Sequence, residues 1–516
     1  MTRYHTIVVG AGSAGAALAA RLTEDPGRRV LLLEAGPDYR SADTPEEIRS
    51  IEPAAIQPTA ALASTHTYPL LMATRSVSQQ PQVYARGRGV GGSSSVNGLF
   101  SIRPTVEDFD GWAAAGCAGW GFDDALPLLN RLENDQDFGA EEYHGDNGPI
   151  PISRPRREDF ATLDSSVDAA ATRLGHGWAP DHNAPGTTGL SPYAFNSLGK
   201  VRVSTNDGYL EPARDRAGLT VQGDALVDRV LFSGTRAIGV RVVVAGQVQE
   251  LLADEVVVAA GAIHTPAILQ RSGLGPADEL RALGIEPLTD LPVGRGLQEH
   301  AGMSMGVALH EVFDYGSKPS RGQLCLRFTT GVGGEVNDGM IAVTGALGVG
   351  VPVGGVVGWS NRVASTGTVV IASTDPSLDP RVDFNMLSDP DDLRRYRAVV
   401  DQLRELAMQP ELQRAGTVLG LGTAMVSPGT TMSDSEFTQF ALSEVIDTVH
   451  ATGTCRMGRE DDPRSVTDPA GRVLGLSGLR VADTSLLPWT PRANTNLAAI
   501  FIGEKIADTM RHEVRP

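Results

Sequence analysis

Two polar residues near the C-terminal end of the chain have side chains that could carry out acid–base chemistry on a hydroxyl group. His450 lies in the segment 448–453 (TVHATG), and Asn494 lies in the segment 493–496 (ANTN). The pKa of a histidine lies near neutral pH, so the imidazole can act as a general base that takes a hydroxyl proton. An asparagine amide can donate a hydrogen bond to the oxygen on which negative charge then develops. If the hydroxyl-bearing carbon is oxidised to a carbonyl, it also loses a hydride, and a hydride acceptor is then needed.

A glycine-rich loop at the opposite end of the chain indicates a bound dinucleotide. Residues 4–9 are typical of a buried strand, residues 10–15 read GAGSAG, and residues 16–22 are typical of a helix. A second apolar strand over 29–33 ends at Glu34, close to the offset of about 20 residues expected after the last glycine. This order of elements predicts a βαβ unit that binds a dinucleotide.

Each glycine of the loop has its own physical reason. Gly10 permits the tight turn, Gly12 lets the backbone approach a pyrophosphate, and Gly15 lets the helix pack closely on the strand. Glu34 can accept hydrogen bonds from a ribose and would repel a 2′-phosphate, which disfavours NADP, whereas the loop alone suits both FAD and NAD. The dinucleotide-binding positions predicted here are Gly10, Gly12, Ser13, Ala14, Gly15, Glu34 and Ala35.

Two further segments rich in small residues decide between these cofactors. Residues 86–97 (RGRGVGGSSSVN) and 261–275 (GAIHTPAILQRSGLG) allow a backbone to lie flat against a planar ligand. Together with residues 291–300 and 479–485, they resemble the signatures of the glucose–methanol–choline (GMC) family of flavin oxidoreductases, over essentially the whole chain. The chain is most similar to the smaller bacterial alcohol oxidases of this family, of the hydroxymethylfurfural oxidase-like or glycoside 3-oxidase-like type. The resemblance implies FAD.

The resemblance also implies which positions contact FAD. Val227 is expected to meet the adenine through its backbone, and Asp483 and Thr484 are expected near the ribityl and pyrophosphate portion. Some members attach FAD covalently through a histidine immediately before the signature Asn97; Val96 occupies that position here, so non-covalent FAD is expected. The implied contacts are Arg86, Val90, Gly91, Gly92, Ser93, Asn97, Gly98, Leu99, Val227, Ala260, Asp483, Thr484, Asn494 and Thr495.

By position, the resemblance implies that His450 is the base and that Asn494 orients the substrate oxygen and holds the alkoxide. Asn494 is also a natural cap for the helix predicted over 497–507, so it can serve both purposes. The start of that helix, with the backbone amides of Thr495 and Asn496, is expected to point at the flavin N1–C2 edge, where the reduced ring carries negative charge.

The substrate pocket is predicted from the catalytic segment and from two strands. Val449 adjoins the base, Trp359 is a candidate wall, and Arg327 is a candidate polar contact, although strand tryptophans are usually core and strand arginines usually exposed. His264 and His300 lie in family-like segments and are assigned structural roles.

The predicted fold class is α/β, with a Rossmann-like FAD-binding domain and a second α+β substrate domain built on an antiparallel sheet. Residues 323–328, 355–362 and 368–371 alternate as strands do, and 389–408 is typical of a helix. Residues 38–80 lack a regular pattern and are a candidate lid. The FAD-binding domain is expected to comprise 1–155, 196–310 and 446–516, and the substrate domain 156–195 and 311–445.

Composition excludes other classes of function. The 516 residues carry a net charge of −18, which argues against a nucleic-acid partner, because phosphate binding needs clustered Lys and Arg. The three cysteines form neither a disulfide framework nor a metal-ligand spacing, so no metal is expected. No secretory signal and no apolar stretch of membrane-spanning length are visible, so a cytoplasmic protein without a membrane span is expected.

The predicted function is FAD-dependent oxidation of an alcohol CH–OH group to a carbonyl, with hydride transfer to flavin N5 and with O₂ as the acceptor that yields H₂O₂. An aromatic content of 5% and Gly/Ser/Asn/Arg-containing strands favour a sugar or glycoside hydroxyl as the substrate. The alternatives are a benzylic or furanic primary alcohol, a dehydrogenase that uses another acceptor, a hydroxynitrile lyase on the same scaffold, and a flavin-binding protein without activity.

Overall fold

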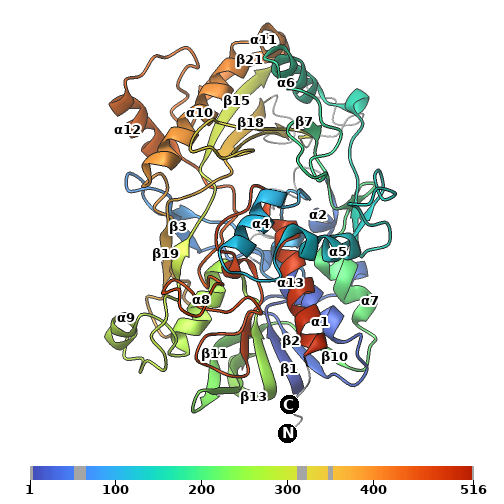
Figure 1. Ribbon diagram of the computed structural model, residues 1–516, viewed down its shortest axis with the longest axis vertical. Coiled ribbons are helices and arrows are strands. Elements are labelled where there is room, and N and C mark those ends of the chain that lie inside the picture. The colour runs from blue at the N-terminus through green and yellow to red at the C-terminus, as the bar shows by residue number, and fades with distance from the viewer. Residues whose placement is uncertain (1–3, 52–64, 311–321, 347–352, 514–516) are drawn as a thin grey trace.

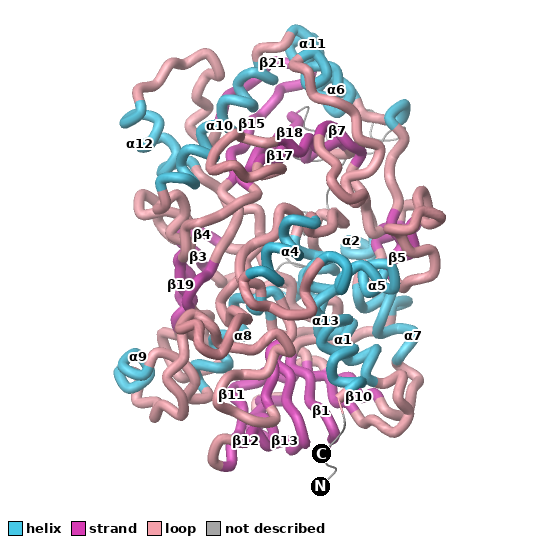
Figure 2. The backbone as a smooth tube through the Cα atoms, viewed as in Figure 1, coloured by secondary structure: helices cyan, strands magenta, loops and turns pink. Residues whose placement is uncertain are grey.

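The computed structural model describes the chain except for residues 1–3, 52–64, 311–321, 347–352 and 514–516 (Figure 1). Two large sheets lie at opposite ends of the molecule, and a smaller sheet and several long loops lie between them (Figure 2). The seven-stranded sheet lies at the lower end of the view, near both chain termini, and the six-stranded sheet lies at the upper end.

The seven-stranded sheet is built around β1, which pairs in parallel with β2 and with β13. β10 and β22 extend the parallel part, whereas β11, β12 and β13 form an antiparallel extension. All four residues of β2 are buried, as expected of a parallel strand that is covered on both faces. In spatial order the strands are β10 (Leu219–Gln222), β2 (Val30–Leu33), β1 (Tyr4–Val9), β13 (Gln247–Val258), β12 (Arg236–Val244) and β11 (Ala225–Ser233), with β22 (Leu479–Val481) beside β13.

The first helix and the last helix of the chain pack against each other on this sheet. α1 (Ser13–Leu22) is rich in alanine, and α13 (Thr495–His512) crosses it through Gly503, where an added Cβ would lie 2.2 Å from Ala14 O. Glu504, which is fully buried, accepts hydrogen bonds from Arg21 on α1. Figure 1 shows α13 in red beside α1 in blue. This packing joins the glycine loop to the segment that contains Asn494.

The six-stranded sheet is antiparallel throughout, and α10 (Pro390–Ala407), α6 (Thr162–Arg173) and α11 (Pro410–Ala415) pack around it. The predicted α/β fold, with a nucleotide-binding sheet and a second antiparallel sheet, is confirmed. In spatial order the strands are β21 (Gly416–Leu421), β15 (Gly302–Leu309), β18 (Val353–Ser360), β17 (Gly339–Ala346), β16 (Leu324–Phe328) and β7 (Gly189–Pro192).

A five-stranded sheet lies beside the centre of the molecule. Its order is β14 (Arg295–Leu297), β19 (Gly367–Val370), β20 (Arg381–Asp383), β3 (Met72–Thr74) and β4 (Gln82–Val83). The other helices include α2 (Glu46–Arg49), α4 (Val106–Ala114), α5 (Phe122–Leu132), α7 (Glu211–Ala213), α8 (Gly261–Arg271), α9 (Ala277–Ala282) and α12 (Asp434–Glu444). Two short pairs complete the strands, β5 (Glu133–Asp135) with β6 (Ile150–Ile152) and β8 (Ser197–Leu198) with β9 (Val201–Arg202).

The elements agree with the sequence patterns more closely than the expected domain limits do. The helix predicted over 389–408 is α10, and the three predicted strands are β16, β18 and β19, each within a few residues. β15, however, precedes the expected limit at 310 and yet pairs with β18 and β21 in the six-stranded sheet. The sheet that β15 joins is set by pairing with strands far away in the sequence. Among the described residues, no helix combines the length and apolar character required to cross a membrane.

Candidate active site

One cavity of about 710 Å³ joins the two ends of the chain. Glu34, Ala35 and Val227 line it at the nucleotide-binding sheet, and His450 and Asn494 line it toward the six-stranded sheet. Its volume lies within the roughly 300–1,000 Å³ that is typical of ligand and cofactor sites. The cavity therefore places the predicted dinucleotide loop and the predicted catalytic pair in one continuous space.

The glycine loop requires its glycines for packing as much as for ligand approach. Gly10 has a φ of +101°, and a Cβ on it would lie 2.5 Å from Ala259 O. A Cβ on Gly15 would lie 2.0 Å from Gly10 O, and one on Gly92 would lie 2.6 Å from Gly12 Cα. The loop at 10–15 and the segment at 86–97 thus pack backbone against backbone, which only residues without side chains permit.

Glu34 ties these two segments together. Its Oε2 accepts a hydrogen bond from Ala11 N at 2.8 Å, and its Oε1 accepts from Gly36 N and Gly89 N, each at 2.9 Å. Burial raises the pKa of Glu34, and these three amides oppose the shift. The predicted ribose contact would use the acceptor capacity that is left on Oε2, so the carboxylate braces the loop as well as facing the cavity.

Most of the predicted cofactor positions line the cavity. They are Gly10, Gly12, Ser13, Ala14, Glu34, Ala35, Arg86, Gly92, Ser93, Asn97, Gly98, Val227, Ala260, Asp483, Thr484, Asn494 and Thr495. Gly15, Val90, Gly91 and Leu99 do not line it. Val90 and Leu99 are buried behind the wall, and Gly91 N donates to Ala11 O at 2.8 Å. These four residues shape the loops that face the cavity.

Asp483 has a positioning role that its sequence context does not reveal. Its carboxylate accepts hydrogen bonds from Gly261 N at 2.9 Å, Thr265 Oγ1 at 2.6 Å and Ser485 N at 2.8 Å. Burial raises its pKa, and these donors oppose that shift. Asp483 therefore anchors the first turn of α8 against the loop that follows β22.

The start of α13 leaves side-chain amide groups unused at the cavity. Asn494 is the N-cap residue of α13, but its side chain makes no capping hydrogen bond. Asn494 Oδ1 and Asn496 Nδ2 are buried and have no hydrogen-bond partner among the described residues. Both residues line the cavity. A polar ligand edge at this helix start would satisfy these groups, and the helix dipole would favour negative charge there.

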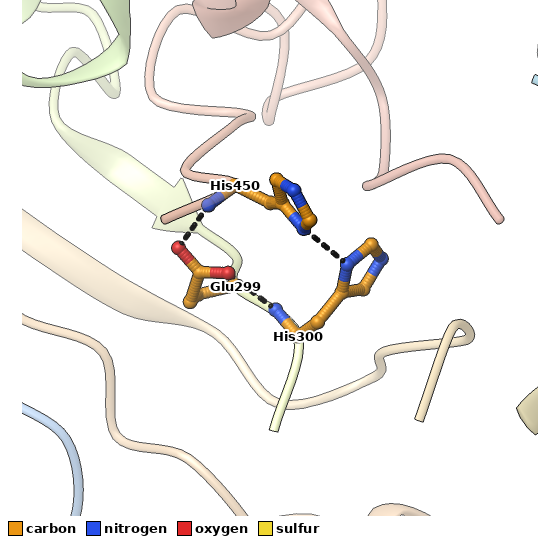
Figure 3. Close-up of side chains that lie close together, drawn as sticks. All are labelled: Glu299, His300 and His450. Carbon is orange, nitrogen blue, oxygen red and sulfur yellow. Dashed lines mark hydrogen bonds between the residues drawn. The ribbon is translucent and has the colours of Figure 1, made fainter. Parts of the chain in front are cut away.

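His450 and Asn494 converge in the buried wall of the cavity. Asn494 Nδ2 lies 3.2 Å from His450 Nε2, and the two side chains are both largely buried. The other ring nitrogen, His450 Nδ1, lies 3.0 Å from His300 Nδ1 (Figure 3). It also lies 2.8 Å from Thr448 Oγ1. Burial first, then His300 and Arg86, lower the pKa of His450 well below 6.5. The imidazole is therefore neutral at neutral pH, as a base must be.

His300, which is assigned a structural role from its sequence context, lies against the proposed base. Its ring contacts the ring of His450 edge-on, with centroids 5.1 Å apart. His300 lies in the segment before β15, far from His450 in the sequence. The direct contact therefore depends on how the loop at 447–452 packs against that segment. His264, in contrast, lies on the cavity wall beside Asp379 and stacks on Tyr68.

Glu299 organises the backbone around His450. Its Oε2 accepts hydrogen bonds from His450 N and Tyr84 Oη, both at 2.6 Å. Its Oε1 accepts from His300 N at 2.9 Å (Figure 3). The same oxygen accepts from Thr448 Oγ1 at 3.1 Å. Although Glu299, His300 and His450 are close enough together to suggest a metal site, all four acceptor positions of the carboxylate are in use. This arrangement holds a loop rather than presenting free ligand atoms.

Val449 is held in a backbone conformation that β-branched residues rarely adopt. Its φ is +59°, and its side chain is 36% exposed at the cavity. Arg86 Nη2 donates to Val449 O, and Val449 N donates to Asp447 Oδ1 at 3.2 Å. Asp447 in turn pairs with Arg75. The surrounding contacts thus impose a turn that directs the next amide, His450 N, at Glu299.

The wall near His450 is mainly apolar. Trp359 lies with its ring 6.5 Å from that of His450, and its Nε1 donates to Asn361 Oδ1 at 2.8 Å rather than into the cavity. Val357, on the same strand as Trp359, and Ala342, its partner on β17, also line the cavity. Phe100, Thr344, Ile446, Thr448 and Val449 are further lining residues.

Arg327 is not part of this wall. It is buried, and its Nη1 donates to His182 O at 3.2 Å beside a second, very small cavity. Burial lowers its pKa. The alternating pattern of β16 places Arg327 on a strand but does not show which neighbour its side chain meets. The candidate lid at 38–80 contributes Tyr68, Pro69 and Leu70 to the cavity, and its residues 52–64 lie outside the described part of the chain.

Comparisons with known proteins show which family and fold the chain is similar to. Residues 4–302 and 363–503 match the N-terminal and C-terminal models of a family described as GMC oxidoreductase. The chain is 36% identical to the 5-(hydroxymethyl)furfural oxidase of Methylovorus sp. (strain MP688), covering 99% of each chain. It is 35% identical to the oxygen-dependent choline dehydrogenase of Pseudomonas savastanoi pv. phaseolicola, covering 99% of this chain and 94% of the relative. The solved structure of pyridoxine 4-oxidase from Mesorbium loti matches with a TM-score of 0.90 at 28% identity, covering 99% of this chain and all of that one.

Proposed function

This chain belongs to the GMC oxidoreductase family and is an FAD-dependent oxidoreductase that acts on alcohols, and on that premise we propose a specific reaction, substrate class and acceptor. The proposed reaction is oxidation of a primary alcohol on an aromatic or furanic ring, with His450 as the base and O₂ as the final acceptor. FAD supplies the hydride acceptor when it is bound. The convergence of His450 Nε2 and Asn494 Nδ2, 3.2 Å apart in one cavity wall, carries this proposal.

The described residues suit FAD in three ways. Glycine backbones of the segments 10–15 and 86–97 form a cradle that side chains would fill. The buried amide groups of Asn494 and Asn496 that lack partners supply polar contacts for a ring edge at the start of α13. Val96 offers no nucleophile for attachment. We therefore expect FAD to be held without a covalent bond, with its dinucleotide end at Glu34 and its reactive end at His450.

A hydroxyl group placed in the cavity beside both His450 Nε2 and Asn494 Nδ2 has both partners that it needs. The hydroxyl donates its proton to His450 Nε2, and the oxygen accepts a hydrogen bond from Asn494 Nδ2. Asn494 then stabilises the negative charge that develops on this oxygen, in surroundings that exclude most water. A base placed in this way contributes roughly 10²–10⁴-fold to the rate.

The lining near His450 leads us to prefer a ring-bearing alcohol. The sequence texture favours a sugar or glycoside, but Ala342, Val357 and Trp359 present mainly apolar surface there. A polyhydroxylated substrate would leave hydroxyl groups without partners against such a wall, which costs free energy. The names of two relatives, 5-(hydroxymethyl)furfural oxidase and pyridoxine 4-oxidase, support this substrate class and oxygen as acceptor.

Anaerobic reduction of the bound flavin tests the proposal. Purified protein is mixed without oxygen with benzyl alcohol, 5-(hydroxymethyl)furfural, choline or methyl glucoside, and the flavin absorbance is followed. We expect the first two to bleach the flavin fastest, and admitted oxygen to restore the colour with release of peroxide. His450→Gln is expected to retain FAD and lose the bleaching. Faster bleaching by the glucoside would overturn the substrate class, and turnover with oxidised flavin throughout would favour a lyase.

A further inference from the structure

Hydrogen bonds from His450 to His300 and Thr448, and from Thr448 to Glu299, decide which nitrogen of His450 is unprotonated. His300 Nε2 lies 3.0 Å from Pro491 O, and a carbonyl oxygen can only accept, so Nε2 carries the proton of His300. Burial lowers the pKa of His300 to about 4, and the carbonyls of Pro491 and Asn361 oppose that shift. His300 is therefore neutral at neutral pH, and its Nδ1 is an acceptor.

The same reasoning applies to Thr448. Its hydroxyl donates to Glu299 Oε1, so its oxygen is free to accept from His450 Nδ1. The two neighbours of His450 Nδ1, namely His300 Nδ1 and Thr448 Oγ1, are thus both acceptors. The proton of neutral His450 must lie on Nδ1, which leaves the lone pair on Nε2, beside Asn494 and the cavity.

We propose that His300 and Thr448 are positioning residues that hold His450 in the Nδ1–H tautomer, and that the chain His450 Nδ1–H to Thr448 to Glu299 stabilises the imidazolium formed when His450 takes the substrate proton. This inference rests on the proposed role of His450 as the base. In the step, the O–H bond of the alcohol breaks and an N–H bond forms at Nε2, while the Nδ1 proton stays in place. No proton passes from His450 to Thr448 or Glu299.

The charges around the site suit this role. Glu299 accepts four hydrogen bonds and donates none. Because Tyr84 Oη accepts a hydrogen bond from Ala451 N, the hydroxyl proton of Tyr84 must point at Glu299. Burial and then Asp447 raise the pKa of Glu299 to about 7, whereas Tyr84, Arg86 and the His450 amide favour its ionised form. Arg86 and His300 disfavour charge on His450, so the link through Thr448 is the route by which a carboxylate supports it.

Two matched pairs of variants separate this role from a purely structural one. Thr448→Val keeps the side-chain shape but removes the hydroxyl, and Thr448→Ser keeps the hydroxyl. His300→Gln places its amide near the Nε2 position, toward Pro491, whereas His300→Asn places its amide near the Nδ1 position, where its oxygen can accept from His450. The rate constant of anaerobic flavin reduction by benzyl alcohol is measured for each variant, together with FAD content.

We expect Thr448→Val and His300→Gln to reduce flavin about 10–100-fold more slowly, a part of the roughly 10²–10⁴-fold that a positioned base contributes. Thr448→Ser and His300→Asn are expected to recover most of the rate. In Thr448→Val, the acid limb of the pH–rate profile is also expected to move to lower pH. The imidazolium of His450 then loses its hydrogen bond through Thr448 to Glu299, so the pKa of His450 falls. Thr438→Val, at a half-buried position on α12 away from the cavity, serves as the matched control.

Equal rates for Val and Ser at position 448, or for Gln and Asn at position 300, would overturn the inference while leaving the base assignment intact. If the acid limb of the pH–rate profile did not move in Thr448→Val, the stabilising role of Glu299 would be overturned. If His450→Gln itself reduced flavin at the normal rate, the proposed base would be wrong, which is a different result.

Discussion

The hydroxyl of Ser13 donates a hydrogen bond to Asn496 Oδ1 at 3.1 Å, across 483 positions of the sequence. Ser13 lies within the glycine loop at 10–15 and opens α1, and Asn496 lies in the first turn of α13. The bond therefore joins the segment that binds the dinucleotide to the segment that presents Asn494. It therefore fixes the predicted dinucleotide-binding loop relative to the predicted catalytic residue Asn494.

Asn494 is predicted to stabilise charge rather than to cap its helix. Because its side chain makes no capping bond, Asn494→Ala is expected to unfold at nearly the wild-type temperature and to retain FAD. Loss of one donor to a developing oxyanion typically costs about 10²–10³-fold in rate, and we expect such a fall in flavin reduction. Asn494→Asp should be at least as slow, since its carboxylate repels the alkoxide. A large fall in stability with little change in rate would contradict the assignment.

Trp359 is predicted to recognise the ring of the substrate. Trp359→Ala is expected to lower kcat/KM for benzyl alcohol about tenfold, because aromatic contacts contribute roughly 0.5–1.5 kcal/mol beyond their buried area. For a small aliphatic alcohol the loss should be much less. Steady-state peroxide production with both alcohols measures this selectivity. The matched control is Trp178→Ala, since Trp178 is 37% exposed and pairs with Arg157 away from the cavity. Equal losses for both alcohols would show that Trp359 only supports the fold.

Gly503 is predicted to be required for the contact between α1 and α13. An added Cβ would lie 2.2 Å from Ala14 O, so Gly503→Ala must push the helices apart. We expect a loss of about 1–3 kcal/mol in the free energy of unfolding, as overpacking usually causes, and weaker retention of FAD. Chemical denaturation and flavin content after dialysis measure these effects. Gly177→Ala is the control, because a Cβ there would meet nothing within 4 Å. Unchanged values for Gly503→Ala would refute the close packing.

His144 is predicted to make stability depend on pH. Its Nδ1 lies 2.5 Å from Glu133 Oε1, and its Nε2 lies 2.8 Å from Asp181 Oδ2. Burial lowers its pKa, but Asp181 and Glu133 raise it by more, so the net shift is upward from 6.5. A group with a raised pKa stabilises the folded state below its unfolded pKa, and that stabilisation is lost as the pH rises through the folded value.

The free energy of unfolding is therefore expected to fall as the pH rises above about 6.5 and through the raised pKa of folded His144, and His144→Gln should remove this part of the dependence. Urea denaturation across that range measures both proteins. His512→Gln, at a largely exposed position, should follow the wild-type curve. Parallel curves for wild type and His144→Gln would rule out the buried imidazolium.

Local patterns in the sequence predicted the fold class and most of the cavity. The glycine loop, the acid at 34 and the small-residue segments each place their signal within a few neighbouring residues, so their chemistry can be read without tertiary contacts. The same holds for the apolar alternation that indicates β16, β18 and β19. Where a function depends on one segment, its residue types and spacing are sufficient.

Contacts between distant segments could not be read in this way. Periodicity predicts the strand β16, but it does not show that Arg327 turns away from the main cavity or that β15 joins the six-stranded sheet. It likewise gives no sign that His300 meets His450, because that contact depends on the packing of two loops. The sequence by itself determined the family, the cofactor class and the candidate His–Asn pair. Only the tertiary structure decided which nitrogen of His450 faces the cavity, since hydrogen-bond partners far apart in the chain assign that proton.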